Sequence, residues 1–155
     1  MTKVLNVQKW RYSKMYLSKP KNFALQELVD PWTYENYGQA SWQFLDPTAL
    51  MILQNLREQY GETTVNNWHK GGKRLYAGFR PPQCKTGSKL SLHKLGKAFD
   101  LFFKNVSACE VRHDMEDFLL DKEPFNEIGA IELNVEWFHF DVRSRTVHRV
   151  LWITP

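Results

Sequence analysis

Long apolar runs and cysteine-rich motifs are both missing from this chain. No apolar run approaches the length of a membrane span, and the stretch from residue 1 to residue 11 is too short of apolar residues for a signal peptide. The two cysteines, Cys84 and Cys109, have no C-x-x-C spacing and so give no sign of a thiolate metal site. We therefore expect cytoplasmic synthesis, no membrane insertion and two free thiols.

Internal repeats, low-complexity segments and Gly- or Ser-rich linkers are also missing, so we expect the 155 residues to form one domain with its own core. The net charge of +4 is spread along the chain without a basic block, which argues against a nucleic-acid partner. A weak positive field would help approach to an anionic polymer, although the same charge also serves simple solubility. We expect a monomer.

Helix signals mark two main stretches. An Asp followed by Pro begins a pattern of helical spacing over 46–61, which a Gly ends. A second amphipathic pattern follows a capping-box sequence and covers about 107–121. One or two helical turns are expected within 22–30, and residues 32–44 are expected to form an aromatic-rich loop.

Short runs of alternating or β-branched residues predict strands between and after these helices. Helices that are separated from mostly antiparallel strands indicate an α+β domain, with a small central antiparallel sheet and flanking helices. Residues 1–20 are expected to form an arm or an edge strand. The predicted strands cover 63–68, 74–79, 97–103, 128–133, 137–142 and 150–153.

The candidate chemistry lies in S-L-H-K-L-G-K-A-F-D at 91–100 and E-W-F-H-F-D at 136–141. Two imidazoles and one carboxylate, from His93, Asp100 and His139, suit a zinc ion and leave a fourth position for water. Each residue alone fits an ordinary structural role, so the joint pattern carries the prediction. Gly96 would allow the chain to fold back between the first two ligands.

Glu136 is the candidate general base for that water. Its spacing of three from His139 would place the two on opposite faces of a regular strand, so we expect a bulge or Glu136 on the preceding turn. Asp141 orients a ligand through the second ring nitrogen of that ligand, contacts substrate, or pairs with Arg143. Trp137 fits core packing and a cleft wall equally well.

Arg80 precedes a long loop over 81–92, which is expected to shape the rim of a cleft. A guanidinium beside a metal can share the negative charge that develops on a carbonyl oxygen, or can bind a substrate carboxylate. Ser91 is expected to hydrogen-bond substrate or to fix the loop.

The pattern S-x-H-x-x-G-x-A-x-D at 91–100 is followed by E-x-x-H at 136–139 and preceded by Gly-Phe-Arg-Pro at 78–81. This combination resembles the zinc D,D-peptidases of bacterial cell walls and the phage L-alanoyl-D-glutamate endolysins. The resemblance covers about 46–143, and it departs from the family pattern at Pro82 and Phe99.

The resemblance implies the small α+β fold shared by zinc D,D-peptidases and the hedgehog signalling domain. It implies one Zn²⁺ per chain, with Glu136 and Arg80 as catalytic residues. The expected activity is hydrolysis of a peptidoglycan stem peptide, as a D-Ala-D-Ala carboxypeptidase or an L-Ala-D-Glu endopeptidase. Such an enzyme would act on the cell wall after release, or as part of a phage particle. The alternatives are an amidohydrolase for another dipeptide and a non-catalytic zinc-containing binding or virion module.

Overall fold

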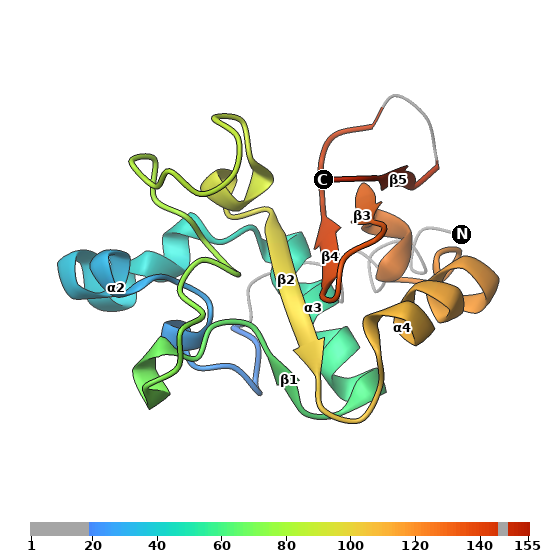
Figure 1. The fold of residues 1–155 in the computed structure, drawn as a ribbon, viewed down its shortest axis with the longest axis horizontal. Helices are drawn as coiled ribbons and strands as arrows, with labels where there is room; N and C mark the ends of the chain where they lie inside the picture. Colours follow the sequence, from blue (N-terminus) through green and yellow to red (C-terminus); the bar gives the residue numbers. More distant parts are fainter. Residues whose placement is uncertain (1–18, 146–148) are drawn as a thin grey trace, which may run out of the picture.

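A five-stranded sheet organises the fold (Figure 1). The computed structural model describes residues 19–145 and 149–155. Across the sheet the strands are β1 (Thr63–Thr64), β2 (Ala98–Phe103), β4 (Phe138–Asp141), β3 (Ala130–Glu132) and β5 (Leu151–Ile153). The expectation of an α+β domain is confirmed. The sheet is mixed, because β5 lies beyond β3 and runs parallel to it, while the other neighbours are antiparallel.

Helices flank this sheet on several sides (Figure 1). They are α2 (Pro31–Tyr37), α3 (Pro47–Tyr60) and α4 (Ala108–Asp114), and α4 continues into a π-helical turn over Met115–Leu119. α3 supplies one side of the core, and the sheet supplies the other through the fully buried Phe99, Leu101, Phe138 and Phe140.

Side-chain alternation in β2 separates the core from the site. Phe99 and Leu101 are fully buried in the core, and Asp100 between them points to the opposite face. The prediction for the two faces of this strand is therefore confirmed.

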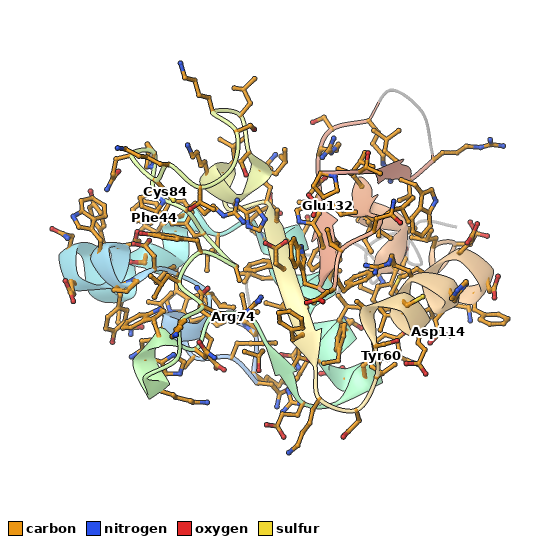
Figure 2. The ribbon with its side chains drawn as sticks, viewed as in Figure 1. Phe44, Tyr60, Arg74, Cys84, Asp114 and Glu132 are labelled. Carbon is orange, nitrogen blue, oxygen red and sulfur yellow. The ribbon has the colours of Figure 1, made fainter. Side chains whose placement is uncertain are left out.

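The two main helix predictions are also confirmed. The Asp46 carboxylate accepts hydrogen bonds from the backbone N–H groups of Thr48 and Ala49, at 2.8 and 3.1 Å, and so caps α3. A capping box begins α4. The Tyr60 hydroxyl donates to Asp114 at 2.9 Å, which joins the end of α3 to the end of α4 (Figure 2).

The expected loop over 32–44 is wrong, because this segment is helical. It contains α2 and a 3-10 helix at Gly38–Phe44. Asp30 caps α2 by accepting from the Thr33 N–H at 3.2 Å, and Pro31 occupies the first turn. The same Asp-Pro signal that predicts α3 was therefore present here as well. Within 22–30 the structure has one 3-10 turn, Leu25–Glu27, in agreement with a short helical segment.

The strands expected over 63–68 and 74–79 are largely wrong. Only Thr63–Thr64 pairs with β2, and a 3-10 turn at Trp68–Lys70 follows. Side chains replace ladder bonds in this region: the buried Asn66 accepts from the Ala77 N–H at 2.9 Å and donates to the Val29 carbonyl at 3.1 Å. The remaining strand predictions match β2 to β5 within a few residues.

Residues 1–18 of the expected arm lie outside the described part of the chain. Both cysteines are free, as expected, with Cys84 buried and Cys109 exposed. Among the described residues, no helix is both long enough and apolar enough to cross a membrane.

Candidate metal centre

His93 is positioned by a 3-10 turn, Leu92–Leu95, that ends at Gly96. Gly96 has a left-handed backbone with φ of 67°. A Cβ atom at this position would lie 1.8 Å from the Phe44 carbonyl oxygen, so no larger residue fits without moving the backbone. The predicted fold-back at Gly96 is confirmed, and it allows β2 to return past His93.

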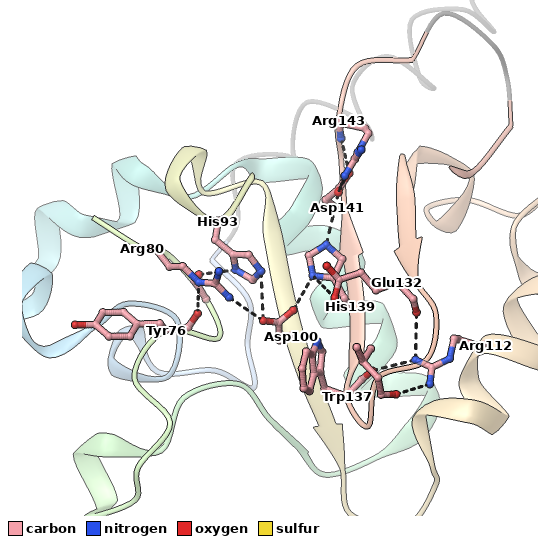
Figure 3. Close-up of polar contacts among 12 residues, drawn as sticks. Tyr76, Arg80, His93, Asp100, Arg112, Glu132, Trp137, His139, Asp141 and Arg143 are labelled. Atoms are coloured by element: carbon pink, nitrogen blue, oxygen red, sulfur yellow. Dashed lines mark hydrogen bonds and ion pairs between the residues drawn. The ribbon is translucent and has the colours of Figure 1, made fainter. Parts of the chain in front are cut away.

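The three predicted ligands meet on the open face of the sheet (Figure 3). Asp100 on β2 and His139 on β4 are register partners, and His139 Nδ1 donates to Asp100 Oδ1 at 2.6 Å. His93 Nε2 lies 3.3 Å from Asp100 Oδ2. One potential ligand atom from each residue lies within 4.8 Å of the others, and all three residues are buried. This cluster can hold a metal ion.

The orientation of His93 fits a ligand role. Its Nδ1 donates to the Gly78 carbonyl at 2.9 Å, which leaves Nε2 facing Asp100. Zinc-bound histidines commonly donate their second nitrogen to such an acceptor. Gly78 itself packs closely on the chain, since a Cβ there would lie 2.2 Å from the Leu28 carbonyl oxygen. The donor set of two imidazoles and one carboxylate therefore fits a borderline cation such as zinc.

The charged groups of the cluster shift each other's pKa values. Burial by itself would raise the pKa of Asp100, but hydrogen bonds with His139 and His93 lower this pKa below its usual range. Burial by itself would lower the pKa of His139, but hydrogen bonds with Asp100 and Asp141 raise it to about 9. Without metal, His139 therefore holds a proton at neutral pH, which a binding cation must displace.

The cluster opens into a cleft of about 830 Å³. One wall comes from residues 73–80 and 86–93, and the other from β3, β4 and residues 153–155. The cleft mixes charges of both signs with apolar surface. The charged lining residues are Lys73, Arg74, Arg80, Asp100, Glu132, Asp141 and Arg143.

Arg80 lies at the edge of the metal cluster. Its Nε donates to the Tyr76 carbonyl at 2.6 Å, and its Nη2 donates to Asp100 Oδ2 at 3.1 Å (Figure 3). Its backbone N–H also donates to the His93 carbonyl, at 3.1 Å. The structure thus brings Arg80 to the site, in contact with a predicted ligand. Ser91 lines the same cleft.

Asp141 lies beside two of the groups that the sequence analysis considers for it, Arg143 and His139. Its fully buried carboxylate forms a bidentate ion pair with Arg143, with separations between 2.5 and 3.1 Å. The same carboxylate lies 3.6 Å from His139 Nε2. Arg143 therefore fixes the Asp141 carboxylate beside the outer ring nitrogen of a predicted ligand, at ion-pair distance.

Glu136 is not brought into this group. It lies on the turn between β3 and β4, as expected, but its side chain is exposed and outside the residues that line the cleft. Trp137 lies between Glu136 and the first residue of β4, Phe138. Trp137 does line the cleft, and its indole nitrogen is buried with no hydrogen-bond partner among the described residues.

Glu132 occupies the cleft where Glu136 was expected. The antiparallel register of β3 and β4 pairs Ala130 with Asp141, which places Glu132 opposite His139. Its Oε2 lies 3.9 Å from His139 Nδ1, and its side chain is 18% exposed. No donor among the described residues hydrogen-bonds this carboxylate, and it is not part of the cluster that can hold a metal. The sequence predicts the hairpin but not the length of its turn. That length sets which residues of β3 and β4 pair with each other.

Comparisons of the chain with protein-family models, curated proteins and solved structures find no match.

Proposed function

We propose that this protein is a zinc-dependent peptidase that hydrolyses an amide bond in peptidoglycan stem peptides, with the fold of the hedgehog and D,D-peptidase group. The observation that carries the proposal is the convergence of His93, Asp100 and His139 at the floor of a cleft. Further support comes from the sequence pattern over 78–139, which resembles those enzymes.

Each of the three ligands has a defined role in this proposal. His93 would bind through Nε2, since Gly78 fixes its other nitrogen, and His139 through Nδ1, with Asp141 beside its outer nitrogen. Asp100 supplies the carboxylate, whose low pKa keeps it ionised. A zinc ion in this position supplies Lewis acidity, which polarises a substrate carbonyl and makes water more acidic.

Proton transfer needs a carboxylate beside the ligands rather than among them. Glu132 meets this condition, because it lies 3.9 Å from His139 Nδ1 and no protein donor binds it among the described residues. Glu136 would have to move from an exposed turn into the cleft. We therefore assign the acid–base role to Glu132, in place of the sequence assignment to Glu136.

Arg80 completes the proposed machinery. Two of its N–H groups are used by Tyr76 and Asp100, and its guanidinium still lines the cleft. The remaining donors can stabilise negative charge that develops on a substrate carbonyl oxygen, or bind a substrate carboxylate.

Metal content and hydrolysis test the proposal together. The wild-type protein should bind about one equivalent of zinc and cleave muropeptides. The cleavage should either release D-Ala or separate the stem peptide into two fragments at the bond between L-Ala and D-Glu. His93→Ala should lose both properties. Metal-loaded wild-type protein that cleaves neither bond would contradict the enzymatic proposal.

Paired glutamine variants test the acid–base assignment. Glu132→Gln should keep zinc and lose about 10²- to 10⁴-fold in kcat, the usual contribution of a positioned acid–base group. Glu136→Gln, the matched control on the turn that follows β3, should stay within about twofold of wild type. The opposite ranking would return the role to Glu136.

A second candidate is a non-catalytic zinc-containing binding or virion module of the same fold. The exposed position of Glu136 favours this candidate, because the only base that the sequence pattern supplies is then outside the site. Zinc binding without hydrolysis by the wild-type protein would support it.

A further inference from the structure

Arg112 of α4 binds the turn that joins β3 to β4 (Figure 3). Its Nη2 donates to the Val135 carbonyl at 2.7 Å, and its Nη1 donates to the Trp137 carbonyl at 3.0 Å and to the Glu132 carbonyl at 3.4 Å. All three acceptors are backbone oxygens. A guanidinium suits this task because its donors form a rigid planar fork that can bind several fixed acceptors at once.

The turn needs such a donor for a physical reason. Ladder bonding between β3 and β4 stops at the turn, and Asn134 has a left-handed backbone with φ of 59° that reverses the chain. Carbonyl groups of a half-buried turn must find donors elsewhere. Arg112 supplies them from a helix that is itself fixed, since its neighbours Val111 and Met115 are fully buried.

The carbonyls at the two ends of this turn belong to residues of the cleft wall. Glu132 and Trp137 both line the cleft, and Arg112 binds the backbone of each without lining the cleft itself. We propose that Arg112 is a positioning residue, which holds the turn so that Glu132 and Trp137 face the metal cluster. Its effect on catalysis rests on the proposed function, whereas its effect on the turn does not.

Substitutions of Arg112 have a specific expected result. Lysine offers a compact ammonium that cannot reach three separated carbonyls together, so Arg112→Lys should behave almost as poorly as Arg112→Ala. Both should keep about one equivalent of zinc, because the ligands lie outside the turn. Hydrolysis should fall about 10- to 100-fold, mainly in kcat, as expected for a displaced supporting residue.

A readout that is independent of activity follows the turn directly. The Leu133 N–H donates to the Ile153 carbonyl at 2.7 Å, so its hydrogen exchange reports opening of the chain at the start of the turn. This exchange should accelerate at least about tenfold in both variants, since the turn carbonyls lose their donor and the turn opens more readily. The Trp137 indole N–H resonance, identified by its loss in Trp137→Phe, should shift. Arg145→Ala is the matched control, because Arg145 also donates to a backbone carbonyl, that of Asn126 at 2.7 Å, away from this turn.

These results separate the two proposals. If the wild-type protein hydrolyses nothing but exchange accelerates in Arg112→Lys, the proposed function fails and the role of Arg112 in holding the turn stands. Wild-type exchange rates and an unshifted Trp137 resonance in Arg112→Lys would overturn the positioning role, as would equal acceleration in Arg145→Ala. Should Arg112→Ala fail to fold, Arg112→Lys alone carries the test.

Discussion

At the scale of single residues, Gly96 decides whether His93 can reach the other ligands. Its left-handed backbone and its contact with the Phe44 carbonyl leave room only for hydrogen. The glycine at this position of the sequence pattern is thus a steric requirement of the site. The same reasoning explains why the approach of His93 to Asp100 could be predicted, since a glycine turn closes the spacing between these two residues.

Gly96→Ala tests this requirement. A left-handed alanine costs about 1 kcal/mol, and relief of the contact with Phe44 must add to it, so we expect a loss of at least about 3 kcal/mol in the free energy of unfolding. Urea unfolding measures the loss. Gly71→Ala is the matched control, because Gly71 has φ of 82° with no atom within 4 Å of an added Cβ. Equal losses in the two variants would show that the close contact has no role.

His139 predicts a pH dependence for the metal-free protein. Its pKa is raised from 6.5 to about 9 in the folded state, so its stabilising contribution is complete below about pH 6.5 and is lost as pH rises through 9. We expect the free energy of unfolding to fall by on the order of 3 kcal/mol across this window. Chemical unfolding in chelator at pH 6.5 and 9.5 measures it.

Two variants control that measurement. His139→Gln should remove the decline, and His113→Gln, which changes an exposed histidine, should keep it. A metal-free protein whose stability is unchanged or higher at pH 9.5 would mean that the bond between His139 and Asp100 does not form.

At the scale of elements, predictability follows local signals. The start of α3 and the two faces of β2 could be predicted because the residues that determine each of them are adjacent in sequence. The same Asp-Pro signal begins α2, but the aromatic and small residues that follow it predict a loop. Residues 74–79 alternate like a strand, yet their backbone bonds to side chains and to single backbone groups of several separate segments.

Asn66→Ala tests how that irregular segment is held. The Asn66 side chain binds the Ala77 N–H and the Val29 carbonyl. Its removal leaves the Ala77 N–H unpaired in the interior, whereas the Val29 carbonyl still accepts from the Trp68 indole N–H at 2.9 Å. An unpaired buried amide group costs about 1–3 kcal/mol, so we expect a loss of that size in the free energy of unfolding. Asn36→Ala, an exposed asparagine bonded to the Trp32 carbonyl, should lose less than about 1 kcal/mol. A comparable loss in both would contradict this account of the segment.

At the scale of the whole molecule, the site depends on contacts between distant segments. The Ala77 carbonyl binds the Asp100 N–H at 2.8 Å, and the hairpin of β3 and β4 adds His139 from the other side. The positions of Glu132 and Arg112 relative to the cleft are also set by contacts between distant segments. Their proposed roles depend on the register of one hairpin and on the placement of one helix, neither of which a local pattern encodes. That is why the sequence predicts the three residues that can hold a metal but does not predict that Glu132, rather than Glu136, lines the cleft.

The most direct test of the central claim is X-ray absorption spectroscopy of the zinc-loaded protein. The account predicts one zinc per chain, bound by two imidazole nitrogens and by oxygen, with loss of one imidazole in His139→Gln. A spectrum with sulfur ligands, or zinc that remains bound with two imidazoles in that variant, would contradict a centre made by His93, Asp100 and His139.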